Sequence, residues 1–157
     1  MFLPVAASAQ LAQAYIVDNK GDLTNIRNAP NGKVVATLPT SGAYVVTLIS
    51  VKNGWWKIDD EVEEYGDDPK TINLSGSRTG YWIHQSLLMA TTAGVGFSKL
   101  YASPSPKSRV VFKGDKYIEL QPIDIKGSWL KMKSVDGNYT GWIQADHLCT
   151  NPLTTCP

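Results

Sequence analysis

The sequence is short of cysteine, of phenylalanine and of long apolar runs. Only two Cys occur among 157 residues, and both lie at the C-terminal end of the chain. No segment approaches the ~20 apolar residues that a membrane-spanning helix needs, so we expect no membrane span. Three Phe stand against five Trp and seven Tyr, a preference for aromatic rings that carry a polar group. Such rings suit cores with hydrated edges, and they also suit recognition surfaces.

An excess of charge of either sign is missing as well. Fifteen basic and 14 acidic side chains nearly cancel, which leaves a formal net charge of +1. A nucleic-acid partner normally requires a clustered basic surface, so the balance argues against one. Catalytic motifs are missing too, because the chain has neither a Gly-x-Ser-x-Gly nor a His-Glu-x-x-His segment. We therefore expect no enzyme, no catalytic residues and no cofactor.

Residues 1–9 (MFLPVAASA) do not resemble part of a folded domain. An apolar stretch is followed by the small-x-small pattern Ala7-Ser8-Ala9, which is typical of the end of a secretory signal peptide. An ordinary apolar first strand is the alternative, and Pro4 and the run of alanines disfavour it. The segment is interpreted as a signal-peptide remnant, which predicts a periplasmic or secreted protein.

The two cysteines, Cys149 and Cys156, stand either side of a six-residue segment. Export makes a disulfide chemically possible, and such a bridge would pin the C-terminal tail, residues 150–157. Two free thiols are an alternative. A partial metal site is another, but only His147 is nearby and no second ligand pair has the necessary spacing. We predict a disulfide and no metal.

Comparison of the chain with itself reveals a repeat. Residues 55–58 (WWKI) match residues 129–132 (WLKM) at an offset of 74, and the same offset relates 28–30 to 102–104. Later the offset drops to 60, where 80–83 (GYWI) faces 140–143 (TGWI). The order and near-constant spacing predict two copies of one unit, at residues 14–89 and 94–149, with residues 90–93 as a short linker.

Each copy reads as short strands separated by turn residues. In the first copy we expect strands at 15–18, 23–27, 34–38, 44–51, 55–59 and 81–84, because apolar alternation or β-branched residues mark each segment. Single helical turns are expected at 86–88 and 146–148. Short strands without an amphipathic helix predict a small, partly open β-barrel for each copy.

The change of offset indicates an insertion, residues 59–79, in the first copy. The second copy joins the equivalent strands through Asp136-Gly137-Asn138, a tight-hairpin signal. The insertion holds seven of the 14 acidic residues of the chain. We expect a solvated, mobile loop. A calcium site and an acidic arm for a basic partner are alternatives, although the spacing does not match a helix-loop-helix calcium loop.

Three segments of the first copy resemble the bacterial SH3-like (SH3b) domain family. They are residues 25–30 (NIRNAP), 53–58 (NGWWKI) and 80–88 (GYWIHQSLL). The second copy matches the same pattern more loosely. The resemblance implies an all-β protein of two small SH3-like, partly open β-barrels in tandem. It also implies extracellular or periplasmic binding, often of peptidoglycan and sometimes of protein.

Strand alternation selects candidate binding residues. If Trp55, like Trp129, faces the core, Trp56 and Tyr81 point outward and form an apolar shelf suited to a peptide or a sugar. Tyr101 and Tyr139 would then make a second, weaker shelf in the second copy. Surface aromatics without a ligand are the alternative interpretation.

Arg27 is a further candidate, because a guanidinium can hold a ligand carboxylate by two hydrogen bonds. A structural ion pair with an acidic residue of the barrel is the alternative. The residues together predict a secreted, non-catalytic binding protein for a cell-envelope ligand, namely peptidoglycan peptide or glycan. The alternative is a protein–protein interaction module, such as an inhibitor or adaptor of an envelope enzyme.

Overall fold

The computed structural model describes residues 11–93, 98–114 and 117–156 of the chain. The protein is nearly all β, with 56% strand and 4% helix, so the predicted all-β class is confirmed. The predicted signal-peptide remnant, residues 1–9, lies outside the described residues. No helix in the described ranges is long and apolar enough to cross a membrane.

The first half of the chain forms seven strands and one short helix. Their bounds are β1 Gln13–Ile16, β2 Leu23–Arg27, β3 Val34–Pro39, β4 Ala43–Lys52, β5 Trp55–Tyr65, β6 Lys70–Asn73, β7 Tyr81–His84 and the 3-10 turn η1 Gln85–Leu87. The second half contributes β8 Leu88–Thr92, β9 Ser98–Tyr101, β10 Val110–Gly114, β11 Glu119–Lys126, β12 Trp129–Ser134, β13 Thr140–Gln144, η2 Ala145–His147 and β14 Leu148–Cys149. Two of the predicted strands, β2 and β7, have the expected bounds, and the others agree to within a few residues except at β5.

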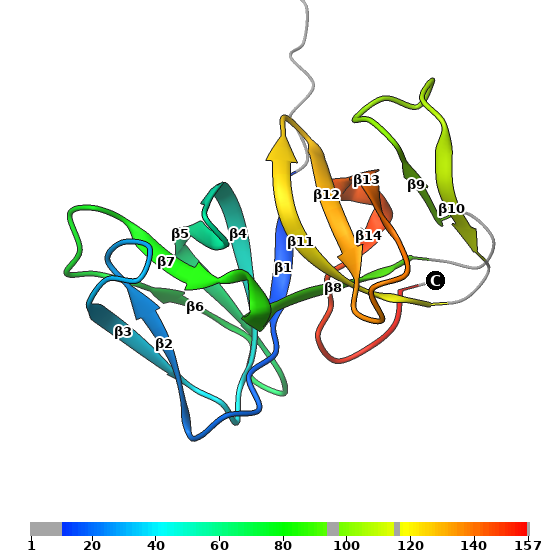
Figure 1. Ribbon diagram of the computed structural model, residues 1–157. Coiled ribbons are helices and arrows are strands. Elements are labelled where there is room, and N and C mark those ends of the chain that lie inside the picture. Colours follow the sequence, from blue (N-terminus) through cyan, green and yellow to red (C-terminus); the bar gives the residue numbers. More distant parts are fainter. Residues whose placement is uncertain (1–10, 94–97, 115–116, 157) are drawn as a thin grey trace, which may run out of the picture.

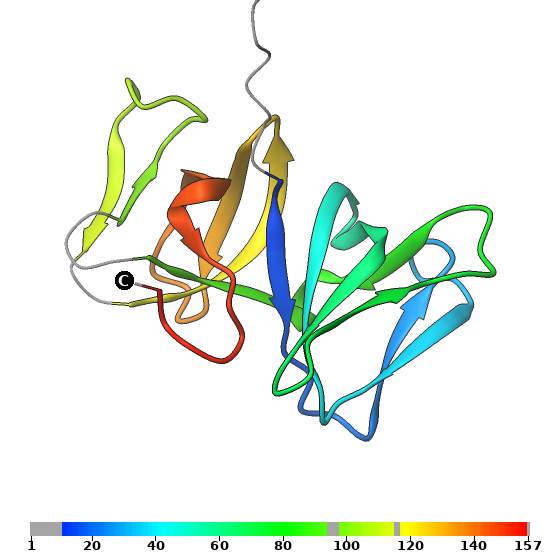
Figure 2. The ribbon, with the colours of Figure 1, turned by 180° about the vertical axis from the view of Figure 1, so that it is seen from behind.

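The strands form one antiparallel open sheet that is not closed into a barrel. Its order is β10-β9-β13-β12-β11-β8-β1-β4-β5-β7-β2-β3, with β14 beside β8 and β6 beside β5. The strands of the first copy therefore lie on one side of β1 and those of the second copy on the other side of β8, as both views show (Figure 1, Figure 2). The path of strands ends at β10 on one side and at β3 on the other.

The strand pairing repeats between the two halves. Trp55 pairs with His84 where β5 meets β7, and Trp129 pairs with Gln144 where β12 meets β13. These pairs preserve the offsets of 74 and 60 that the sequence shows. The irregularity in β4 before Ser50 also recurs in β11 before Asp124. Both copies thus use the same backbone hydrogen-bonding plan.

The expected linker, residues 90–93, is not a linker. Residues 90–92 belong to β8, which pairs with β1 through Leu88 and Met89 and with β11 through Ala90 and Thr91. β14 pairs with β8 as well. In Figure 1, β8 runs across the middle of the molecule from one group of strands to the other. One strand closes the first copy and opens the second, which leaves no length of chain for a tether.

The two copies share one hydrophobic core. Buried side chains of both halves, among them Ile58, Leu120 and Met132, belong to a single apolar cluster. Trp56 is fully buried, and its indole Nε1 donates a hydrogen bond of 3.0 Å to the carbonyl oxygen of Pro122 in the second copy. Two copies joined in this way are expected to unfold together, because neither can separate without exposing apolar surface.

The insertion is a β-hairpin and not the expected mobile loop. Residues 59–65 continue β5, and β6 pairs with them through Val62 and Ile72. Val62 is fully buried and Leu74 is 8% exposed. These apolar side chains anchor the acidic segment to the sheet, so its carboxylates are presented by an ordered strand pair.

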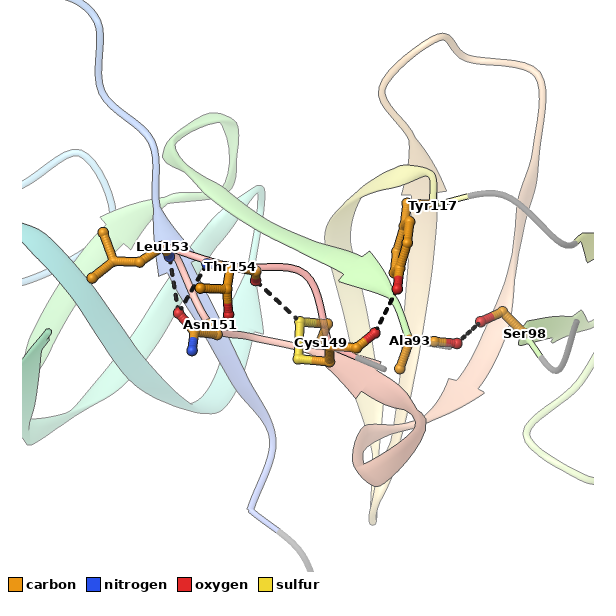
Figure 3. The surroundings of a disulfide bond; sticks show 8 residues. Ala93, Ser98, Tyr117, Cys149, Asn151, Leu153 and Thr154 are labelled. Carbon is orange, nitrogen blue, oxygen red and sulfur yellow. Dashed lines mark hydrogen bonds between the residues drawn. A yellow bond between two sulfur atoms is a disulfide. The ribbon is translucent and has the colours of Figure 1, made fainter. Parts of the chain in front are cut away.

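The predicted disulfide between Cys149 and Cys156 is present, with a Cα–Cα distance of 5.5 Å. Figure 3 shows the disulfide at Cys149 and the tail residues Asn151, Leu153 and Thr154 beside it. The hydroxyl of Tyr117 donates a 2.8 Å hydrogen bond to the carbonyl oxygen of Cys156, and the Asn151 side chain accepts hydrogen bonds from the backbone of Leu153 and Thr154. The tail is therefore a closed loop attached to both β14 and the start of β11.

Candidate functional site

The inward and outward faces of the aromatic strands are the reverse of the prediction. Trp56 and Tyr81, expected on an outer shelf, are 0% and 6% exposed, whereas Trp55 and Trp82 are partly exposed. Side chains two residues apart on a strand share a face. Trp56 lies two residues before the buried Ile58, and Tyr81 lies two residues before the buried Ile83, so both aromatic side chains face the core. That alternation was the signal that could have selected the correct face.

The outward face of the first copy contains a pocket of about 240 Å³. Side chains from β2, β5 and the segments beside them line it: Asp18, Lys20, Leu23, Asn25, Arg27, Trp55, His84 and Leu87. Of the residues proposed from sequence, only Arg27 lies in this pocket. Trp55 and His84 were not predicted as site residues, and they become neighbours through the pairing of β5 with β7.

Arg27 is held beside the ring of Trp55. Its Cζ atom lies 6.0 Å from the centre of that ring, a distance at which a cation interacts favourably with an indole face. Its Nη1 atom donates a 2.8 Å hydrogen bond to the carbonyl oxygen of Gly32. In the described part of the chain, no carboxylate forms an ion pair with Arg27. The structural ion pair considered from sequence is therefore not found there, and the charge can meet a ligand.

His84 also packs against the Trp55 ring. The two rings are 5.1 Å apart and nearly perpendicular, with an interplanar angle of 75°. The backbone N–H of Ser86 donates to Nδ1 of His84 at 3.2 Å. The Ser86 hydroxyl lies 2.7 Å from the same Nδ1 atom. These two contacts fix the orientation of the imidazole ring at the pocket.

Asp18 lines the same pocket, but local hydrogen bonds use its carboxylate. The backbone N–H of Lys20 and the hydroxyl of Thr24 both donate to it at 3.0 Å. These bonds shape the turn between β1 and β2. The remaining polar side chains around the Trp55 indole are two cations, an amide and an imidazole, from Lys20, Arg27, Asn25 and His84. This set suits a ligand that has an anionic group next to an apolar or sugar surface.

The second copy does not reproduce the pocket. Tyr101 occupies the position of Arg27 and lies edge-on to Trp129, with ring centres 5.8 Å apart at 83°. Gln144 occupies the position of His84. The expected shelf of Tyr101 with Tyr139 does not form, because Tyr139 packs against Phe112 at 4.6 Å instead.

The acidic hairpin lies outside the pocket and contains one closely interacting carboxyl pair. The backbone N–H of Glu61 donates to Asp59 at 3.1 Å and, together with a hydrogen bond to Asp60, lowers the pKa of Asp59. The same side-chain hydrogen bond raises the pKa of Asp60. Within the described ranges, no group of His, Cys, Asp or Glu has the arrangement of a metal site. The calcium alternative therefore gains no support.

The fold defines the chain as an all-β protein, and its open antiparallel sheet is consistent with an SH3-like fold. Among solved structures it is similar to NlpC1 from Trichomonas vaginalis, with 15% identity, a TM-score of 0.35, and coverage of 92% of this chain and 47% of that one. It is similar to NlpC2 from the same organism at 15% identity and a TM-score of 0.33, with coverage of 90% and 49%. The chain thus spans about half the length of these proteins, and the likeness is too distant to assign a family. No family model and no curated protein matches it.

Proposed function

We propose that this chain is a secreted, non-catalytic binding protein with two bacterial SH3-like units, whose first copy recognises a peptidoglycan peptide or glycan. The observation that carries the proposal is the Arg27 pocket. Its guanidinium has no carboxylate partner among the described residues and lies against a partly exposed indole. Peptide stems offer carboxylates to such a group, and sugar rings offer apolar faces to the indole.

Two further observations support the proposal. The sequence motifs of the first copy resemble a domain family whose members often bind peptidoglycan. The disulfide between Cys149 and Cys156 suits an oxidising compartment, such as the periplasm or the extracellular space. These observations support the location and the class of protein, whereas the pocket supports the choice of residues.

Sedimentation with purified, insoluble peptidoglycan tests the proposal. We expect the wild-type chain to sediment with the polymer and Arg27→Gln to bind about tenfold or more weakly, since a hydrogen bond to a charged group contributes about 1.5–3 kcal/mol. Arg27→Lys keeps the charge but loses the two-pronged geometry, so we expect it to bind between the two. Trp55→Ala is expected to bind as weakly as Arg27→Gln.

The second copy offers a matched control outside its own aromatic face. Gln144 is the counterpart of His84, so Gln144→Ala should leave sedimentation unchanged, whereas His84→Ala should weaken it. Thermal unfolding of each variant separates loss of binding from loss of fold. A wild-type chain that stays wholly in the supernatant refutes the proposal, and equal losses for the variants of both copies refute the assignment to the Arg27 pocket.

A protein–protein interaction module is the second candidate, and the ordered acidic hairpin favours it. The hairpin presents Asp60, Glu61, Asp67 and Asp68 as exposed side chains. Under this alternative, replacing the four carboxylates with the corresponding amides should abolish capture of a basic envelope protein from the native source. Arg27→Gln should leave that capture unchanged. Because Val62 and Leu74 anchor the hairpin, such amide substitutions preserve the fold better than a deletion would.

A further inference from the structure

One face of the second copy gathers lysines and aromatic rings on three neighbouring strands. On β12, Leu130 and Met132 are fully buried, so the alternate residues Trp129, Lys131 and Lys133 point the other way. The same alternation on β13 and β9 turns Trp142, Lys99 and Tyr101 outward. We name these six residues the β9–β13–β12 face.

The cross-strand register makes this face continuous. Lys131 pairs directly with Trp142, and Trp142 pairs directly with Tyr101. Directly paired side chains lie on the same side of a sheet, within about 5.5 Å of one another at Cβ. A row of cation, indole and phenol therefore crosses the three strands, with Lys99 and Lys133 beside it along β9 and β12.

The rings of this face are fixed and partly exposed. Tyr101 and Trp129 meet edge to face at 5.8 Å, and all three aromatic side chains are accessible in part. In such a pair, the ring that presents its edge keeps both of its faces clear of its partner. An apolar surface with a set orientation is thus available to a planar or ring-shaped ligand.

The charge of the face is unbalanced. None of its three lysines forms an ion pair with a carboxylate of the residues that the structure describes. Asp124 pairs with Lys131 across the strands, but its carboxylate accepts the backbone N–H of Ile125 at 2.8 Å. In the first copy, the equivalent positions hold Asn25, Lys57 and Asp59. The excess of cations is therefore particular to the second copy.

We propose that the β9–β13–β12 face binds an anionic polysaccharide, with sugar rings stacked on its aromatic side chains and acidic groups held by its lysines. From the rise and spacing of strands, Lys131 and Lys133 are about 7 Å apart along β12, and Lys99 on β9 is about 12 Å from Lys131. This spacing of charges suits a polysaccharide that carries one acidic group for every one or two sugar rings. A nucleic acid, with a phosphate at every nucleotide, requires a denser basic surface than a chain of net charge +1 provides.

Affinity electrophoresis of the full-length chain tests this proposal. The probes are polygalacturonate, which carries carboxylates, a phosphorylated mannan, which carries phosphates, and neutral dextran. We expect at least one of the two anionic polymers to retard the chain, dextran to have no effect, and the retardation to weaken with added salt. The two anionic probes identify which acidic group is preferred.

A triple variant that combines Lys99→Gln, Lys131→Gln and Lys133→Gln should bind the anionic polymer about tenfold or more weakly. The reason is that several charge-assisted contacts are removed together. Trp142→Ala should reduce it in a separate variant. Lys57→Gln, the equivalent of Lys131 in the first copy, is the matched control and should retain full retardation. Thermal unfolding checks that every variant remains folded.

Four results overturn the proposal: no retardation by either anionic polymer, equal retardation by dextran, full retardation of the triple variant, or equally tight binding of single-stranded oligothymidylate. A fifth result that overturns the proposal is self-association, in which this face binds the acidic hairpin of another molecule instead of a polysaccharide. Light scattering would then show a mass that rises with protein concentration, and no polysaccharide binding would be found. Because the Arg27 pocket is untouched by these variants, this test can fail while peptidoglycan sedimentation succeeds, and the reverse also holds.

Discussion

The two copies share their backbone plan and differ on their outward faces. The pairings at offsets of 74 and 60 recur strand by strand, and buried positions such as Ile83 and Ile143 match. Outward, Arg27 in the first copy corresponds to Tyr101 in the second, and each lies against the equivalent tryptophan. The inward residues maintain the sheet, so the outward residues are free to differ. A pocket results in one copy and an open basic face in the other.

The copies also differ where they meet. Trp56 of the first copy is equivalent to Leu130 of the second, yet only Trp56 donates a hydrogen bond across the junction. We expect Trp56→Ala to lower the free energy of unfolding by about 3–5 kcal/mol, the usual cost of removing a buried Trp. Trp56→Phe should cost about 1–3 kcal/mol, because the Pro122 carbonyl loses its donor. Denaturant titration measures both.

Leu130→Ala is the matched control for this substitution. It should lower the free energy of unfolding only through the cavity that the missing side chain leaves. The m-value should equal that of the wild-type chain unfolding in one cooperative transition. Two separate transitions in the wild-type chain, or a neutral Trp56→Phe, would contradict the shared core that we describe.

The ends of the copies provide the next comparison. The first copy ends by running into β8, whereas the second ends in the two-residue strand β14 and its disulfide. Replacing both cysteines with serine should cost about 2–3 kcal/mol, since the bridge closes a short loop in the unfolded chain. Reductant should lower the melting temperature of the wild type and leave the serine variant unchanged. A melting temperature insensitive to reductant would show that the β14–β8 pairing needs no bridge.

The two copies use the same left-handed turn position before β5 and β12. Asn53 has a φ of 51°, and Gly127, its counterpart, has a φ of 59° with open space around it. Gly127→Asn should therefore be neutral, because Asn tolerates the left-handed region. Gly127→Val should cost about 1–2 kcal/mol. Thermal unfolding distinguishes the two, and equal losses would show that the turns differ in conformation.

The smallest effect is expected at the hairpin that the first copy replaces with its insertion. The backbone N–H of Asn138 and the hydroxyl of Ser134 donate to Asp136 and lower its pKa. A pKa that is lower in the folded state stabilises the protein at pH values above the ordinary aspartate pKa of about 3.9. This stabilisation is lost as the pH falls through the lowered pKa.

Asp136→Ala should consequently destabilise the chain slightly at neutral pH and less in acid. Melting temperatures of both proteins across this range provide the measurement. A constant difference at every pH would mean that the turn does not depend on the charge of Asp136.

The residues of the candidate site were the least predictable feature from sequence. Two adjacent tryptophans are equally apolar, and the choice of Trp55 for the core followed no local signal. Ile58 and Ile83 could have corrected that choice. The acidic insertion misled for a different reason: its charges suggested a solvated loop, while Val62, Ile72 and Leu74 carried the weaker apolar alternation of a hairpin.

The strand-rich class, most strand bounds, the repeat and the cysteine pair could all be predicted from sequence, because each depends on local alternation, turn residues or self-similarity. Three features became visible only in the folded chain: β8 pairs with strands of both copies, Trp56 donates a hydrogen bond to Pro122, and Arg27, Trp55 and His84 line one pocket. These features depend on segments distant in sequence that meet across the sheet. No local pattern encodes such contacts, since the energy of burial depends on what covers a side chain as well as on its own chemistry.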